Sequence, residues 1–247
     1  MKVGGRKNLK KYYEDDAVAG EYIEKRFTAP VYSVEHDKQV RILNAVIRKV
    51  VPKRILEIAP GPARLTHDVN AGGIAVDNSE SMLRIARSRM KSSPFRWKFV
   101  KGDAFSLRFP PRSFDLVFTF RFIRHFEKPD RERLYAQVRK VLSRGGYFVF
   151  EIPNRRKNRT VRGIVGEEKY NVYDFLTEED EIIRELESNG FEVLQMIGTS
   201  KHFFTQVFIS KLSSFLRVAG LGKKAIRAVD RIHGENPLEW VLICRKK

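Results

Sequence analysis

The stretch Arg54-Ile-Leu-Glu-Ile-Ala-Pro-Gly-Pro-Ala-Arg64 decides the fold of this chain. It begins with a short apolar segment that ends in a carboxylate, Glu57, which is typical of a buried strand. Small residues from Ala59 to Ala63 then form a turn. Because proline is favoured in the first turn of a helix, a helix is predicted to begin between Pro62 and Thr66. A strand, a tight turn and a helix in this order bring backbone N–H groups close to a bound ligand.

A second apolar segment, Gly73-Ile-Ala-Val-Asp77, also ends in a carboxylate and follows Glu57 by twenty residues. In an open α/β sheet, an acid at the end of the second strand is placed to bond the hydroxyls of a ribose. The two segments together therefore predict a nucleoside site at the carboxyl end of a sheet.

These segments resemble the first two motifs of the class I S-adenosylmethionine (SAM)-dependent methyltransferases. The family pattern is an acid, one apolar residue and then Gly-x-Gly-x-Gly, which this chain meets as Glu57-Ile58 and Ala59-Pro60-Gly61-Pro62-Ala63. Alanine replaces two of the three glycines. Alanine permits a close approach of the backbone but tolerates positive φ poorly. The sequence therefore does not decide whether the loop near Ala59 and Ala63 follows the same path as in the family. The loop alone is equally typical of an ordinary strand–helix turn.

Further segments follow the same family pattern in order. They are Asp77-Asn-Ser-Glu-Ser-Met-Leu83, Trp97-Lys-Phe-Val100, Lys101-Gly-Asp-Ala104, Ser113-Phe-Asp-Leu-Val-Phe-Thr119 and Leu142-Ser-Arg-Gly-Gly-Tyr-Phe-Val-Phe150. The resemblance extends over roughly residues 52–197. It implies a Rossmann-like α/β fold with a seven-stranded, mostly parallel sheet, an antiparallel last strand and helices on both faces. The last two strands are expected at 191–197 and 238–244.

The resemblance implies that SAM is the cofactor. The backbone around Ala59 and Gly61 is expected to face the methionine part of SAM. Asp77 is expected to face the ribose, and Asp103 and the Ala104 N–H are expected to face the adenine. The expected cofactor-binding residues are Glu57, Ala59, Pro60, Gly61, Asp77, Asn78, Met82, Asp103, Ala104 and Thr119, with Tyr22 and Arg26 from a segment that related enzymes use as a lid. Asp77 and Asp103 are also typical of strand-end caps or turn formers. Tyr22 and Arg26 are equally typical of the flank of a packed helix.

Charge is the strongest signal in the composition. The 247 residues include 48 lysines and arginines against 30 aspartates and glutamates, which gives a formal net charge of +18. Such an excess favours association with polyanions, chiefly nucleic acid, although a generally basic surface without a specific partner explains it as well. The many charged residues are also typical of thermophilic proteins.

Other features of the sequence indicate a cytoplasmic protein without a membrane-spanning segment. No apolar run approaches the ~20 residues that a span requires. The first residues lack the apolar region of a secretory signal. The single cysteine, Cys244, excludes an internal disulfide. At 42% hydrophobic residues, the chain can bury a full core.

We predict one methyltransferase domain over residues 1–247. Its parts are an N-terminal lid or substrate segment (1–33), the SAM-binding core (34–200), a basic helical insertion (201–233) and the last strand (234–247). Apolar spacing predicts helices over 34–50, 79–90 and 129–142. A capping box at Thr177 to Asp180 predicts another helix, which Gly190 should end.

The insertion at 201–233 contains seven lysines and arginines and one acid, Asp230. Leu212, Phe215, Leu216 and Ala219 recur at helical spacing and form an apolar stripe. We expect two helices whose apolar positions pack on the sheet, with the basic positions in water.

The substrate side is expected where the fourth strand ends, in Thr119-Phe-Arg-Phe-Ile-Arg-His125. Phe120 or Phe122 is a candidate to stack on a planar base, and Arg121 to bond a carbonyl or phosphate. If alternate residues here belong to the core, only one phenylalanine is available. His125 matches a histidine that is more often structural than a base in the family. The candidate catalytic residues are therefore Arg121, Phe122 and Phe120.

A basic segment follows the fifth strand, at the sheet edge where open α/β proteins bind ligands. Its expected RNA-binding residues are Arg155, Arg156, Lys157, Arg159 and Arg162. The chain lacks an ordered cluster of metal-ligating residues, so no metal is predicted. Methylation at carbon 5 of a pyrimidine requires a cysteine near the site, and Cys244 lies in the last strand instead.

The leading hypothesis is therefore a SAM-dependent methyltransferase that modifies a base nitrogen of tRNA or rRNA, with RNA as the partner. The alternative is methylation of a small molecule or of a lipid- or quinone-like substrate, with 201–233 as a lid or a segment that touches a membrane surface. A dinucleotide oxidoreductase fits less well, because its glycines follow G-x-G-x-x-G whereas the small residues here fall at 59, 61 and 63.

Overall fold

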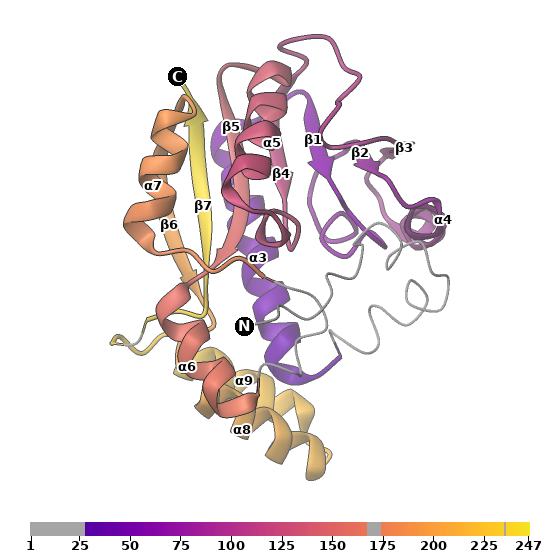
Figure 1. The fold of residues 1–247 in the computed structure, drawn as a ribbon. Coiled ribbons are helices and arrows are strands. Elements are labelled where there is room, and N and C mark those ends of the chain that lie inside the picture. The colour runs from indigo at the N-terminus through magenta and orange to yellow at the C-terminus, as the bar shows by residue number, and fades with distance from the viewer. Residues whose placement is uncertain (1–27, 167–173, 235) are drawn as a thin grey trace.

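The computed structural model describes residues 28–166, 174–234 and 236–247, and its centre is a single β-sheet (Figure 1). The strands are β1 (Ile55–Ile58), β2 (Gly73–Asp77), β3 (Trp97–Lys101), β4 (Phe114–Thr119), β5 (Leu142–Pro153), β6 (Phe191–Thr199) and β7 (Glu239–Lys246). Their order across the seven-stranded sheet is β3-β2-β1-β4-β5-β7-β6. Neighbouring strands from β3 to β5 are parallel, whereas β7 is antiparallel to both β5 and β6. The predicted sheet is confirmed.

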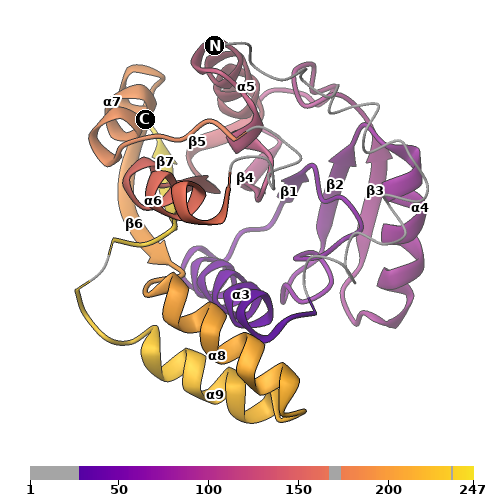
Figure 2. The same cartoon turned by 60° about the horizontal axis from the view of Figure 1, so that its bottom comes forward.

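Helices cover both faces of this sheet, as predicted (Figure 2). The described helices are α3 (Pro30–Val50), α4 (Glu80–Arg89), α5 (Lys128–Val141), α6 (Arg155–Val165), α7 (Glu179–Ser188), α8 (Phe203–Phe215) and α9 (Ala219–Val229), with short 3₁₀ turns η1 (Met90–Ser92) and η2 (Ile123–His125). Successive residues of a strand point to opposite faces. In β4, Val117 packs with the cluster that includes α5 and α7, while Leu116 and Phe118 pack with the cluster under α3. The sheet is thus buried on both sides, which is usual for parallel strands.

The helix predicted to begin between Pro62 and Thr66 does not form. Residues 61–68 make a series of turns instead. Ala63 has a φ of 59°, which lies outside the right-handed helical region. The chain therefore cannot pass from the loop directly into a regular helix at this point.

Two helix starts differ from the predicted positions. α3 begins at Pro30, four residues before the predicted start. The capping box of α7 lies one residue later than predicted, because Glu178 is the N-cap and its N–H donates to the Glu181 carboxylate at 3.2 Å. Thr177 instead forms an isolated bridge with Asn154, which ties the start of α7 to the end of β5.

The insertion between β6 and β7 forms the two predicted helices, α8 and α9, but the expected burial of the apolar stripe is wrong. Leu212, Phe215 and Leu216 are exposed. Ile226 of α9 is fully buried and packs against Val31 of α3. Among the described helices, none has the length and hydropathy to cross a membrane.

Candidate functional site

A cavity of about 470 Å³ lies where β1, β2, β3 and β4 end. Its volume falls in the usual range for sites that bind small molecules. The predicted cofactor residues that line it are Glu57, Ala59, Pro60, Gly61, Asp77, Asn78, Met82, Asp103 and Ala104. Thr119 is buried in the sheet, and its hydroxyl donates to the Ile58 carbonyl at 2.7 Å, so its predicted contact with a cofactor is not supported. Tyr22 and Arg26 lie outside the described residues.

The loop after β1 has an unusual backbone. Ala59, Gly61 and Ala63 all have positive φ, at 54°, 56° and 59°. These are the three positions at which the family pattern has glycine, so the loop keeps its path although two of the residues are alanines. For an alanine, the left-handed region costs about 1 kcal/mol or more, and the contacts of the loop must offset this strain.

Hydrogen bonds from neighbouring strands hold the loop. The Ala59 N–H donates to the Val76 carbonyl at 2.8 Å, and the Gly61 N–H donates to Asp77 Oδ2 at 2.9 Å. A Cβ placed on Gly61 would meet no heavy atom within 4 Å, so the backbone faces open space here. A ligand can therefore approach the main chain closely.

Asp77 connects the loop to the helix that follows β2. Its Oδ1 accepts the Ser79 N–H at 2.9 Å, while Oδ2 accepts the Gly61 N–H. Burial raises the pKa of Asp77, and the backbone N–H groups of Ser79 and Gly61 oppose this rise. A carboxylate has about four acceptor positions, so Asp77 retains acceptor capacity for hydroxyl groups of a ligand.

Glu57 is buried beneath the same loop. The Thr66 hydroxyl donates to Glu57 Oε2 at 2.6 Å. Burial raises the pKa of Glu57 to about 8, although the Thr66 hydrogen bond and the Arg64 charge lower it. Glu57 is therefore largely protonated at neutral pH.

Asp103 and Ala104 follow β3 and also line the cavity. Asp103 is exposed, and its Oδ1 accepts the Phe105 N–H at 2.9 Å, which is the bond of a turn former. Ala104 is buried. Met82 reaches the cavity from α4, whose N-cap is Ser79.

Four phenylalanines form one wall of the cavity, which we call the aromatic wall: Phe105, Phe120, Phe122 and Phe126. Phe122 lies 4.8 Å and Phe105 lies 5.0 Å from Phe126, measured between ring centroids, with the rings edge to face. Phe120 is buried in the core cluster under α3, whereas Phe122 is half-buried, which agrees with the expectation that the core leaves only one of them available. Sequence reasoning missed Phe105 and Phe126, which are adjacent in the sequence to motif residues.

Arg121, the third predicted catalytic residue, also lines the cavity. It has a φ of 57°, and its N–H donates to Glu151 Oε1 at 3.1 Å. A non-glycine residue in this region stores backbone strain, and such residues cluster at functional sites.

Behind Arg121 lies a cluster of ionisable side chains that sequence reasoning missed. Glu35, Glu151 and Glu239 have carboxylate oxygens within 4.8 Å of one another. Burial raises the pKa of Glu151 to about 7. Burial also acts to raise the pKa of Glu239, but the charges of Arg124 and Arg121 outweigh it and hold that pKa at about 2. Because Arg124 pairs with Glu239 inside the cluster, these arginines supply the positive charge that the carboxylates require.

His125 lines the cavity beside the aromatic wall. Its Nδ1 lies 3.3 Å from Asp174 Oδ1. Burial acts to raise the pKa of Asp174, but the charges of Arg124 and His125 hold it well below its usual range. An imidazole oriented by an ionised carboxylate is a common arrangement for a general base.

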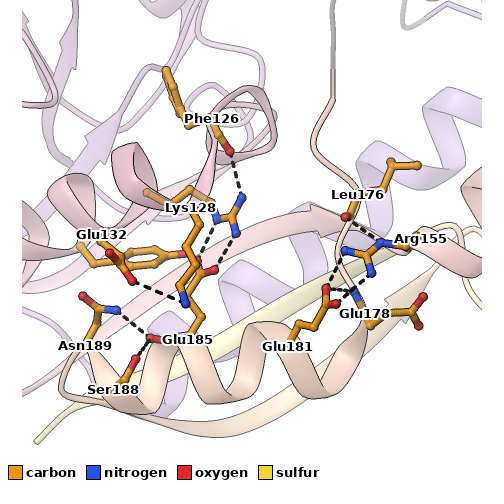
Figure 3. Close-up of polar contacts among 12 residues, drawn as sticks. Phe126, Lys128, Glu132, Arg155, Leu176, Glu178, Glu181, Glu185, Ser188 and Asn189 are labelled. Atoms are coloured by element: carbon orange, nitrogen blue, oxygen red, sulfur yellow. Dashed lines mark hydrogen bonds and ion pairs between the residues drawn. The ribbon is translucent and has the colours of Figure 1, made fainter. Parts of the chain in front are cut away.

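The basic segment after β5 forms α6, and most of its predicted RNA contacts have partners within the protein. Arg155 makes two hydrogen bonds to the Glu181 carboxylate, at 2.8 and 2.6 Å (Figure 3). Arg156 pairs with Glu178 at 3.1 Å. Arg162 is buried and pairs with Asp174 at 3.0 Å, so it does not fit the expected RNA contact.

The other two basic residues of this segment differ from each other. The Lys157 ammonium lies 5.7 Å from the centroid of the Phe204 ring on α8. Arg159 is exposed. Arg155 and Lys157 thus connect α6 to α7 and α8.

Comparison with known proteins agrees with the fold and the cavity. Residues 55–146 match a family model described as a methyltransferase domain. A demethylmenaquinone methyltransferase of Thermotoga maritima is 28% identical over 176 residues, which are 60% of this chain and 74% of that enzyme. A sterol 24-C-methyltransferase of Aspergillus fumigatus is 31% identical over 91 residues, 36% of this chain and 24% of that enzyme.

Solved structures with the same fold were also found. The crystal structure of magnesium protoporphyrin IX methyltransferase from Synechocystis with bound SAH has a TM-score of 0.67 and 14% identity, covering 97% of this chain and 98% of the other. A SAM-dependent methyltransferase from Thermotoga maritima, described as a possible histamine N-methyltransferase, has a TM-score of 0.60 and 19% identity, covering 96% and 99%.

The sheet order, the cavity at the strand ends and these matches identify the class: the protein is a SAM-dependent methyltransferase of the class I fold. SAM is its cofactor. The residues present fit this ligand, because the open space above Gly61 admits it close to the main chain and Asp77 can accept from its hydroxyls.

We expect Asp77→Ala to weaken SAM binding about 100-fold, because charge-assisted hydrogen bonds to the ligand and support of the loop are both lost. Isothermal titration calorimetry measures the change. Asp115→Ala is the matched control, since Asp115 accepts the N–H groups of Lys53 and Arg54 at the amino end of the sheet. Equal SAM affinity in wild type and Asp77→Ala would contradict the role of Asp77.

The raised pKa of Glu57 predicts a dependence of stability on pH. The native state holds a proton that the unfolded chain releases above its ordinary value of 4.5. The free energy of unfolding should therefore fall between pH 4.5 and about 8, by on the order of 4 kcal/mol from this group. Urea unfolding of wild type and Glu57→Gln, which keeps an oxygen for Thr66, isolates the effect. The variant should show a flatter pH profile, and identical profiles would refute the assignment.

Proposed function

We propose that the protein transfers the methyl group of SAM to a small apolar acceptor of the quinone or lipid class. The aromatic wall carries this proposal. Phe105, Phe122 and Phe126 pack edge to face and present apolar surface beside the loop that faces the cofactor. Such a wall binds a flat, apolar ring and excludes water from it.

The names of the relatives support this acceptor class. The matching enzymes of Thermotoga maritima and Aspergillus fumigatus are named for a menaquinone precursor and a sterol. The enzyme of similar fold from Synechocystis is named for a protoporphyrin. All three are named for largely apolar small molecules.

An RNA base is the competing acceptor, and the net charge of +18 favours it. The basic residues of α6 support it less than the sequence suggested, because Arg155, Arg156 and Arg162 pair with carboxylates of this chain. Arg162 is buried, and Arg155 uses all three guanidinium nitrogens on Glu181 and the Leu176 carbonyl, so neither is available to phosphate while these contacts hold. Arg156 stays 75% exposed in its pair. We therefore favour a small apolar acceptor, the alternative from the sequence, over the RNA base of the leading hypothesis.

SAM supplies a methyl group on a sulfonium, which is already activated for in-line displacement. The chain has to place the acceptor, exclude water and take the proton that the acceptor releases. We assign the first two roles to the aromatic wall and the third to His125, oriented by Asp174. Arg121 would stabilise negative charge on an acceptor oxygen.

Incubation of the full chain with methyl-labelled SAM tests the acceptor class. We expect label in the lipid and quinone fraction of an extract from cells that lack the protein. Total RNA from the same cells should take up none. Asp77→Ala serves as the inactive control. Label in RNA and none in the lipid fraction would overturn the proposal.

His125→Asn should lower kcat about 100-fold or more while SAM affinity stays unchanged, because proton removal is lost and the cofactor contacts remain. The pH–rate profile should also lose the limb that reports the base. His67→Asn is the matched control, since His67 forms a similar pair with Asp68 at 2.7 Å but does not line the cavity. A variant with the wild-type pH profile would show that His125 is structural.

A further inference from the structure

Helix α8 exposes more apolar surface than an ordinary surface helix. Its buried residues are polar: Gln206, Ser210 and Ser213. Val207 and Ile209 pack beside the cluster of α3 and α9, but the larger apolar residues face solvent, with Phe208 at 66% and Phe215 at 84% exposure. An amphipathic helix of a soluble protein normally buries the apolar side.

Specific contacts hold α8 in this orientation. Ser210 Oγ accepts the Val31 N–H of α3 at 3.3 Å, and Gln206 Nε2 donates to Asp230 Oδ1 at 3.3 Å. A Cβ placed on Gly222 of α9 would come within 2.1 Å of Ser213 Oγ, so only glycine permits this approach of the two helices. The exposure of the apolar side is therefore built into the packing of α8.

The exposed apolar surface continues from α8 into the turn between the helices. We call it the hairpin face, and it comprises Phe208, Leu212, Phe215, Leu216, Val218 and Leu221. Leu221 at the start of α9 is 63% exposed. Within α8, Phe208, Leu212 and Phe215 follow the spacing i, i+4, i+7 and so lie on one side of the helix. Exposed apolar surface of this kind marks an interaction site.

The charge around the hairpin face indicates what covers it. Residues 203–229 contain five basic residues, Lys211, Arg217, Lys223, Lys224 and Arg227, and no acidic residue. A second copy of the chain on a two-fold axis would bring these like charges together. An anionic lipid surface accepts both features, since it offers negative headgroups to lysine and arginine and an apolar boundary to phenylalanine and leucine.

The position of the hairpin relates it to the cavity. Both β5 and β6 are antiparallel to β7, so β6 runs parallel to β5 and to the strands that end at the cavity. α8 follows the carboxyl end of β6, and α9 returns to the start of β7. The hairpin therefore leaves the sheet at the same edge as the cavity (Figure 1).

We propose that the α8–α9 hairpin docks on an anionic lipid bilayer, with the hairpin face at the headgroup boundary and Lys211, Arg217 and Lys224 on the headgroups. The docking stands on the structure of the hairpin alone. Its use, to bring the cavity to an acceptor held in the bilayer, rests on the proposed function.

Flotation of the full chain with vesicles of phosphatidylcholine, with and without phosphatidylglycerol, tests the docking. Wild type should float with the anionic vesicles and bind more weakly as salt is added. Phe208→Ser with Phe215→Ser should weaken binding at least about 10-fold, since both side chains are exposed in the free protein and lose apolar burial only on docking. Lys211→Gln with Lys224→Gln should weaken it about 10-fold at low salt.

Val51→Ser is the matched control, because Val51 is 75% exposed at the far end of α3 from the hairpin. Its binding should equal that of wild type. Equal flotation of wild type and the double phenylalanine variant would overturn the proposal. So would a dimer in analytical ultracentrifugation that this variant dissociates, because a second copy would then cover the hairpin face.

A water-soluble quinol separates failure of docking from failure of the proposed function. The double phenylalanine variant should methylate this probe as fast as wild type, while its activity on acceptors in vesicles falls. Absence of vesicle binding by wild type, with methylation of the probe intact, would refute docking alone. Vesicle binding without methylation of any lipid or quinol would refute the proposed function alone.

Discussion

The hydrogen bond from the Gly61 N–H to the Asp77 carboxylate is the contact on which the site depends. It connects the loop after β1 to the end of β2 at 2.9 Å. Ala59 and Ala63 hold the loop in a strained left-handed conformation on either side of it. Loss of this contact would let the alanines relax, so the space above Gly61 and the acceptor oxygens of Asp77 would be lost together.

A second constraint acts at the end of β4, where Arg121 also has positive φ. Its N–H donates to Glu151, and the cluster of Glu151 with Glu239 and Arg124 joins β5 and β7 to η2. Removing one member would leave a buried charge without its partner, which typically costs about 3–5 kcal/mol. The cluster therefore keeps the chain between Phe120 and Phe122 in place, and with it the aromatic wall.

Features that depend on neighbours in the sequence were predictable, and those that depend on distant packing were not. The strand ends at Glu57 and Asp77 follow from local apolar patterns. The cluster of Glu35, Glu151 and Glu239 joins α3, β5 and β7, and no local pattern predicts that meeting. The spacing of the stripe at Leu212 identified a helical face, but periodicity alone cannot tell whether that face points to the core or to solvent.

The positive charge of the chain predicted a nucleic acid partner, yet its distribution in the structure favours lipid. On α6, Arg155, Arg156 and Arg162 pair with carboxylates of this chain, whereas on α8 and α9 the basic residue with such a partner in the described part of the chain is Arg227, which pairs with Asp37. There the cations lie among exposed aliphatic side chains such as Leu212 and Leu221. Single-stranded nucleic acid is held by cations with stacking aromatic rings, a role open to Phe208 and Phe215 but not to the four aliphatic residues of the hairpin face. Leucines beside lysines instead match the two layers of a bilayer surface, its charged headgroups and its hydrocarbon boundary.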